Sequence, residues 1–181
     1  MKITFSQFKH IANRSRGTEC FEAVVCFDGN PALIATNDGS GGADRFSPLP
    51  GQNSDQQRAN LRLLESDLLT PSGGIMSDGT KGPSDLESFF AVLVDVEIRA
   101  QSLRRMLKSS ILYTTTNPPC LYTSTEKPSE YWYAYLRANH SAAVILNELP
   151  FEKALDLYLD YGWPMAGQNR NPDLLGVAVA S

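Results

Sequence analysis

The helical pattern of residues 84–109 constrains the fold of this chain more than any other feature of the sequence. Apolar side chains recur there at the spacing of one helix face: Leu86, Phe89, Phe90, Leu93, Ala100, Leu103 and Leu107. Ser84 followed by Glu87 is a capping-box pattern for the start of a helix. Acidic residues fill the first half and basic residues the second, which suits the helix dipole. We therefore predict a long helix over residues 84–109.

Residues 18–36 predict a β-hairpin. Alternate apolar residues lie on one face of its first strand, namely Phe21, Ala23, Val25 and Phe27. Asp28-Gly29 supplies the turn, and Pro31 suits the first position of the return strand because it lacks an N–H group. The hairpin is followed by residues 37–45, where three glycines within four residues exclude both helix and strand.

The remaining elements complete an α+β fold. We predict helices over 54–69 (with a Ser54/Gln57 capping box), 129–139 and 150–161, and short strands over 111–115, 121–123 and 143–146. A chain of 181 residues can bury a sizeable core. The prediction is one domain over 1–181: a small antiparallel sheet, built on 18–36 and 111–123, packed against the long central helix and the C-terminal helix. Residues 70–83 are predicted to form a flexible loop and 164–181 a tail.

The net charge and the cysteines limit the classes of binding partner and the cellular compartment that we expect. Sixteen Lys and Arg against twenty Asp and Glu give a net charge of −4, opposite in sign to that of a nonspecific DNA binder. The three cysteines (Cys20, Cys26 and Cys120) are expected to be free thiols in a reducing cytosol. Lys9 and His10 interrupt what would be the apolar core of a signal peptide, and no apolar run is long enough to span a membrane. We predict a cytoplasmic protein that binds neither membrane nor nucleic acid directly.

Residues 37–45 are candidates for a ligand or partner site. A strand precedes this loop, as in phosphate-binding loops, but the Walker lysine is absent and no helix begins after Arg45. Asp38, Ser40 and Asp44 match the odd-position spacing of a calcium loop, yet Leu49 stands where the twelfth-position glutamate belongs. The loop is therefore interpreted as a turn-rich segment or as a partner contact. Its candidate partner-binding residues are Asn37, Asp38, Ser40, Asp44 and Arg45.

The sequence predicts no catalytic residue, cofactor or metal. It holds two histidines, His10 and His140, which is too few for a multi-histidine metal site. A nucleophilic pair of Cys120 with His140 has no spacing argument in its favour, and a structural cysteine is the commoner case. The activity is thus expected to be non-enzymatic, with a small enzyme that binds a phosphate-containing ligand through the 37–45 loop as the alternative.

Carboxylates recur every fourth residue near the end of the chain. Glu148, Glu152, Asp156 and Asp160 are predicted to line one face of the last helix. Like charges at this spacing repel by a few tenths of a kcal/mol per pair. Two interpretations stay open: a solvated polar face relieved by Lys153, or an acidic stripe presented to a basic partner. The basic cluster of Arg99, Arg104, Arg105 and Lys108 could contact nucleic acid, but the helix dipole is sufficient to account for it.

Aromatic residues are dense between 122 and 135. The group consists of Tyr122, Tyr131, Trp132, Tyr133 and Tyr135, with Trp163 further along the chain. Aromatic rings can stack on bases or form a protein interface, but few basic residues accompany these. Packing in the core is therefore the favoured interpretation.

Several short motifs resemble those of a loose group of small phage and mobile-element proteins. They are Phe21-Glu22-Ala23, Asn37-Asp38-Gly39-Ser40-Gly41-Gly42, Ile111-Leu112-Tyr113 and Leu146-Asn147-Glu148-Leu149-Pro150. Their order around a long charged helix is also similar, and the likeness covers the chain except residues 47–83 and the tail after about 163. No catalytic signature comes with this resemblance.

The resemblance implies an accessory protein. Some phage accessory proteins inhibit host defences of the CRISPR type, so the implied activity is inhibition of a nucleic-acid-handling complex of the host. The partner would be a host protein or ribonucleoprotein with a basic surface, contacted through the 37–45 loop and the acidic stripe. This step is an analogy, because a fold does not determine a function.

Overall fold

The computed structural model describes residues 2–68, 86–116, 119–139 and 144–161, and it confirms the predicted α+β class. The chain divides into two compact units, with the boundary between Ile98 and Arg99 inside one long helix. Each unit is described by itself below. The prediction of one domain over 1–181 stays a prediction. The predicted loop at 70–83, the tail at 164–181 and the helix start at Ser84 lie outside the described residues.

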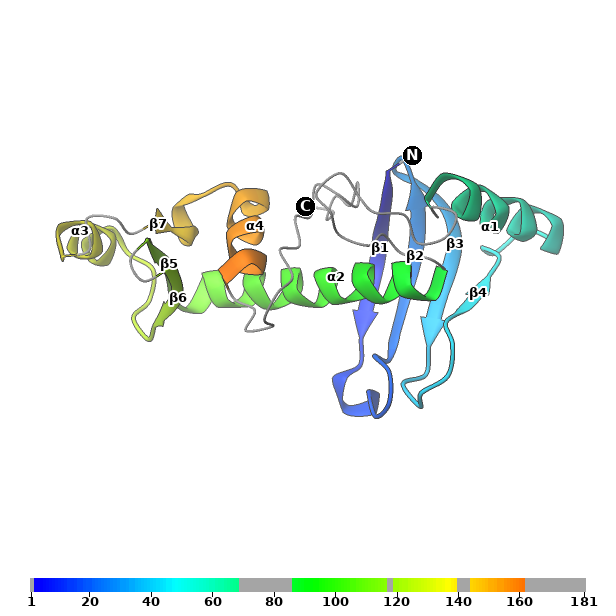
Figure 1. Cartoon of the computed structure of the whole chain (residues 1–181), viewed down its shortest axis with the longest axis horizontal. Helices are drawn as coiled ribbons and strands as arrows, with labels where there is room; N and C mark the ends of the chain where they lie inside the picture. Colours follow the sequence, from blue (N-terminus) through cyan, green and yellow to red (C-terminus); the bar gives the residue numbers. More distant parts are fainter. Residues whose placement is uncertain (1, 69–85, 117–118, 140–143, 162–181) are drawn as a thin grey trace. The chain divides into compact units, whose positions relative to one another are not determined.

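The first unit contains a four-stranded antiparallel sheet in the order β1-β2-β3-β4 (Figure 1). The strands are β1 (Ile3–His10), β2 (Phe21–Phe27), β3 (Asn30–Asn37) and β4 (Arg45–Ser47). The predicted hairpin is confirmed: β2 and β3 pair, with Val25 opposite Leu33. Its turn has positive φ at Asp28 (48°) and Gly29 (84°), the conformation that two-residue hairpin turns of type I′ require.

Strand β1 was not predicted, and its irregular pattern explains why. Ile3 and Phe5 alternate into the core as strand residues should, and Phe8 also packs against that core. The backbone changes register between Ser6 and Lys9, and Gln7 adopts a φ of 54°. This β-bulge moves the next apolar side chain from position 7 to position 8, so the period of two is lost in the sequence.

Two helices pack against this sheet. They are α1 (Ser54–Leu68) and α2 (Leu86–Ser109), whose first half passes over one face of the sheet (Figure 1). Leu64 of α1 and Phe90 of α2 are fully buried in the same core cluster as Val25 and Leu33. Burying each such side chain stabilises the fold by about 1.5–3 kcal/mol. The side-chain amide of Asn60 also donates a hydrogen bond of 2.8 Å to the carbonyl oxygen of Ala32, which connects α1 to β3.

The capping box of α1 lies one residue earlier than predicted. Oδ1 of Asn53 accepts hydrogen bonds from the backbone amides of Asp55 (3.1 Å) and Gln56 (3.0 Å). In return, Oε1 of Gln56 accepts one from the backbone amide of Asn53 (2.9 Å). The predicted Ser54/Gln57 pair is therefore wrong. Gln57 instead donates to the carbonyl oxygen of Phe46, so its side chain connects α1 to β4.

The second unit contains its own three-stranded sheet, in the order β6-β5-β7. Its elements are β5 (Ile111–Thr116), β6 (Pro119–Ser124), α3 (Glu130–Asn139), β7 (Val144–Ile145), the 3₁₀ turn η2 (Leu146–Glu148) and α4 (Phe151–Tyr161). Helix was correctly preferred for 129–139, and Leu136 of α3 packs with Ile111 and Ile145. The expectation of one sheet built on both 18–36 and 111–123 is wrong. Each hairpin instead pairs with a further strand that is nearby in the sequence: β1 pairs with β2, and β7 pairs with β5.

Asn147 connects three elements of the second unit. Its Nδ2 donates to the carbonyl oxygens of Leu107 and Ser110, each at 2.9 Å, at the carboxyl end of α2. Its Oδ1 accepts a hydrogen bond of 2.8 Å from the backbone amide of Leu112 in β5. The last carbonyl groups of a helix have no hydrogen-bond donor within the helix. The side-chain amide of Asn147 acts as that donor here. The Leu146–Pro150 motif thus has a structural role.

Candidate functional site

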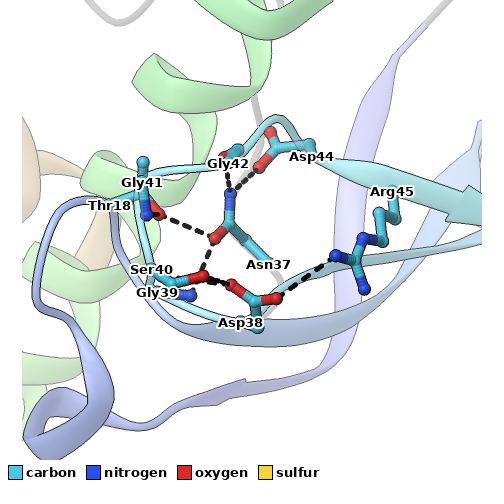
Figure 2. A network of polar contacts seen from close by, with 9 residues as sticks. All are labelled: Thr18, Asn37, Asp38, Gly39, Ser40, Gly41, Gly42, Asp44 and Arg45. Carbon is cyan, nitrogen blue, oxygen red and sulfur yellow. Dashed lines mark hydrogen bonds and ion pairs between the residues drawn. The ribbon is translucent and has the colours of Figure 1, made fainter.

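The glycine loop, defined as residues 37–45, leads from the last residue of β3 to the first residue of β4. Figure 2 shows its polar network, in which all five candidate residues of the loop take part. The structure therefore brings Asn37, Asp38, Ser40, Asp44 and Arg45 together in one loop, and their role as partner contacts stays a prediction. Their roles divide into a buried part and an exposed part.

Asn37 is the centre of the buried part. Its Oδ1 accepts hydrogen bonds from Oγ1 of Thr18 (2.7 Å) and from the backbone amide of Gly39 (2.9 Å). Its Nδ2 donates to the carbonyl oxygen of Gly42 (3.0 Å) and to Oδ1 of Asp44 (2.8 Å). Because a buried side-chain amide must satisfy all its polar atoms, Asn37 fixes the loop conformation rather than contacting a partner. Thr18, 19 residues earlier, carries no sequence signal for this contact.

Gly39 is required by a close approach between two loops. Its φ is +80°, and a Cβ atom there would lie 2.3 Å from the carbonyl oxygen of Arg14. The carbonyl oxygen of Gly39 accepts hydrogen bonds from the backbone amides of Arg16 (2.9 Å) and Gly17 (3.0 Å). The segment between β1 and β2 therefore packs directly against the glycine loop, and no residue other than glycine fits at position 39 without strain.

Asp38, Ser40 and Arg45 form the exposed part of the loop. Oδ1 of Asp38 accepts hydrogen bonds from the hydroxyl and from the backbone amide of Ser40. These bonds lower the pKa of Asp38, with a further contribution from Arg45. Nη2 of Arg45 lies 3.3 Å from Oδ2 of Asp38, and both side chains are mostly exposed. An exposed ion pair of this kind adds little stability. Because both side chains are mostly exposed, both charges are accessible to a partner.

Asp44 has the opposite electrostatic environment. Partial burial raises the pKa of its carboxyl group, and the charge of Glu87 raises it further, while the hydrogen bond from Asn37 acts in the other direction. Asp44 therefore serves the loop as an acceptor for Asn37. It is a less accessible partner contact than Asp38 or Arg45.

The loop does not have the arrangement that binds phosphate. Anion sites of this type present consecutive unpaired backbone amides. Here the amides of Gly39, Ser40 and Gly41 already donate to side-chain oxygens of Asn37, Asp38 and Thr18. The exposed carboxylate of Asp38 would also repel an anion.

The predicted acidic stripe is shorter than expected. Glu148 lies in η2, before α4 begins at Phe151, and its carboxylate forms an ion pair with Arg137 of α3. Because the residues between 148 and 151 are not α-helical, the four-residue spacing to Glu152 does not place Glu148 on the same face. The acidic stripe is therefore defined here as Glu152, Asp156 and Asp160, all on α4. Partial burial raises the pKa of Asp160.

The aromatic group is divided between core and surface. Trp132 and Tyr133 pack against the core of the second unit, as predicted for the whole group. Tyr131 and Tyr135 do not: 72% and 48% of their surfaces are exposed. The four-residue spacing of this pair, which is offset by one from the spacing of Trp132 and Leu136, was a signal for a separate helix face.

Other chemistry is limited in the part of the chain that the structure describes. No group of three or more His, Cys, Asp or Glu residues is placed to hold a metal ion among these residues. Nε2 of His10 lies 2.7 Å from Glu19 and 3.4 Å from Oγ of Ser15, so both contacts fall on one ring nitrogen, unlike a catalytic triad. His140 lies outside the described residues. None of the described helices is both long and apolar enough to cross a membrane.

The chain was compared with known proteins in three ways. No family model matches it, and neither the curated proteins nor the solved structures contain a match. The resemblance to phage and mobile-element proteins therefore stays a prediction from the quoted motifs.

Proposed function

We propose that this chain is a non-enzymatic accessory protein of a phage or mobile element that acts in the cytoplasm of the host cell. It binds a basic surface on a host protein or ribonucleoprotein complex and so blocks that complex. A CRISPR-type defence complex is the target that the sequence motifs suggest. The alternative, an enzyme that binds a phosphate-containing ligand through the glycine loop, is disfavoured because the amides of Gly39, Ser40 and Gly41 already have partners.

The observation that carries this proposal is the acidic stripe on α4. Glu152, Asp156 and Asp160 fall within an arc of about 80° around the helix axis, opposite the buried Ala154. Lys153 is the single base of this helix. Mutual repulsion of the three carboxylates weakens the isolated helix, whereas a basic surface would offset that repulsion and speed association.

The exposed part of the glycine loop is the second proposed contact. Asp38 and Arg45 are held in place by the buried Asn37 network but remain largely exposed themselves. A rigid, exposed loop loses little conformational entropy on binding. Asn37 and Asp44 support this contact from inside the loop.

Charge reversal tests the proposal. Purified CRISPR-type effector complexes are immobilised, and binding of the wild-type chain is compared with that of the double variant Glu152→Lys/Asp156→Lys at low and high salt. The double variant is expected to bind about tenfold more weakly at low salt, with a smaller difference at high salt. Glu65→Lys/Glu126→Lys, at two exposed positions outside the proposed contacts, is the control for net charge because it changes the charge by the same amount, and it should bind like the wild type. Equal affinity of the double variant and the wild type at low salt would remove the stripe from the proposed interface.

A further inference from the structure

Strand β1 lies at an edge of the sheet in the first unit (Figure 1). It pairs with β2 on one side, and no strand among the residues that the structure describes pairs with its other side. The backbone N–H and C=O groups along such an edge are a template on which another chain can add a strand. Proteins counter this hazard by changing the edge strand locally, for example with a charged side chain, a proline or a β-bulge. Strand β1 contains a β-bulge.

The β-bulge holds an exposed residue in a strained conformation. Gln7 and Phe8 together lie opposite one residue of β2, Ala23. The φ of Gln7 is 54°, in the left-handed region that favours glycine. Gln7 is exposed, so burial of its side chain does not offset the cost of this conformation. Strain that persists at such a residue points to a role for the bulge.

The packing of the sheet does not account for the bulge. Removal of Gln7 would place Phe8 directly opposite Ala23, whose side chain lies in the core. Phe8 packs against the same core, so it would stay on the same face of the sheet. Lys9 would stay opposite Glu22, as it is in the bulged strand. A β1 strand without Gln7 would therefore keep both its core contact and its register with β2.

The two ends of β1 show which of its backbone groups face β2. The carbonyl oxygen of Lys2 accepts a hydrogen bond of 2.8 Å from the backbone amide of Asp28, just after β2. At the other end, the backbone amide of Ile11 donates a hydrogen bond of 2.9 Å to the carbonyl oxygen of Cys20, just before β2. Along an antiparallel strand, the backbone groups of successive residues face the two sides alternately. Counting inward from each end therefore gives the residues whose backbone groups face away from β2.

The bulge puts these outward-facing groups out of phase. Counting from Lys2 directs the backbone groups of Ile3 and Phe5 outward. Counting from Ile11 directs those of His10 outward. His10 follows Phe5 by an odd number of positions, whereas the groups that face one side of a regular strand are an even number apart. A straight neighbouring strand can therefore pair with the groups before the bulge or with those after it, but not with both.

We infer that the bulge at Gln7 keeps β1 from pairing with the β1 strand of a second copy of this chain. Two copies of one edge are complementary, because a twofold rotation places them antiparallel to each other. The second copy is therefore the partner that a regular β1 edge would meet most readily. Without Gln7, His10 comes into phase with Ile3 and Phe5, and the whole length of β1 becomes available for pairing. This inference goes beyond the proposed function and does not depend on it.

The test deletes Gln7 and measures self-association by analytical ultracentrifugation. The deletion variant should associate at least about tenfold more tightly than the wild type. Gln7→Gly is the matched control, because it relieves the left-handed strain but keeps the bulge. This control should be more stable than the wild type and should associate to the same extent.

Hydrogen exchange of single backbone amides shows where the copies meet. In the deletion variant, the amides of Ile3 and Phe5 should become more protected as the protein concentration rises. In the wild type and in Gln7→Gly, the protection of these amides should not depend on concentration.

Three results would overturn the inference. The first is a deletion variant that associates no more tightly than the wild type, or that associates without protecting the amides of Ile3 and Phe5. The second is concentration-dependent protection of the same amides in the wild type. The third is a deletion variant that circular dichroism shows to be unfolded, because the fold itself would then require the bulge.

Discussion

The α-carbon of Gly39 lies so close to the carbonyl oxygen of Arg14 that a Cβ atom at position 39 would be 2.3 Å from that oxygen. Gly39→Ala is therefore expected to destabilise the chain by about 3 kcal/mol, from the positive φ together with the steric clash. Gly29→Ala is the matched control, because Gly29 has a similar φ of +84° with nothing within 4 Å of the added atom. It should cost about 1 kcal/mol. Urea denaturation measures the free energy of unfolding of both variants. Equal losses of that free energy in the two variants would show that the loops do not pack as described.

The carboxyl groups of the glycine loop should respond to pH with opposite signs. The folded-state pKa of Asp44 is raised above its ordinary value of 3.8, chiefly by burial, so the folded chain holds this proton more tightly than the unfolded chain. Its ionisation therefore lowers stability as the pH rises through that raised pKa. Asp44→Asn, which keeps an acceptor for Asn37, should be more stable than the wild type at neutral pH, and the difference should vanish below pH 3.8.

Asp38→Asn tests the pH dependence of stability of opposite sign. Hydrogen bonds from Ser40 lower the folded-state pKa of Asp38, so its charged form contributes stability above 3.8 that is lost as the pH falls. This variant should be less stable than the wild type at neutral pH and equal to it in acid. Thermal melts across the pH range test both variants, and shifts of the same sign in the two would contradict the described loop electrostatics.

Asn147 should be among the polar residues on which the second unit depends most. Asn147→Ala removes the hydrogen bonds to Leu107, Ser110 and Leu112 and leaves a partly buried amide and two carbonyls without them. Because buried polar groups without a hydrogen-bond partner are costly, we expect the free energy of unfolding to fall by about 2–4 kcal/mol. Ser109→Ala removes an exposed hydroxyl from the same helix end and should cost less than about 0.5 kcal/mol. Similar denaturation midpoints for the two variants would contradict the role of Asn147.

The sequence predicted the elements whose periodicity is uninterrupted. The stripe of α2 and the alternation of Phe21, Ala23 and Val25 each reflect one face packed on a core, and these elements appear in the structure. Where backbone geometry breaks the period, the sequence was misleading. The bulge at Gln7 concealed β1, and the start of α4 at Phe151, after Glu148, removed one carboxylate from the stripe.

The candidate site was predictable in position but not in its division of roles. The three glycines marked the loop, yet the burial of Asn37 depends on Thr18, which is distant in sequence, so local reasoning placed a structural residue among the partner contacts. The choice between Asn53 and Ser54 as helix cap likewise depends on one residue's backbone conformation, because both side chains are good caps. The separation into two sheets follows from which neighbouring strand each hairpin pairs with, a contact that composition does not encode.

Inhibition stoichiometry separates a protein that acts by binding from one that acts by catalysis. The chain is titrated into a panel of purified CRISPR-type effectors, and target cleavage and the intact masses of the chain and of the effector components are recorded. The account predicts that one effector loses activity in proportion to the added chain, reaching completion only near equimolar amounts, with every mass unchanged. Complete inhibition at a small fraction of the effector concentration, a change in any mass, or full activity of the whole panel at excess chain would contradict it.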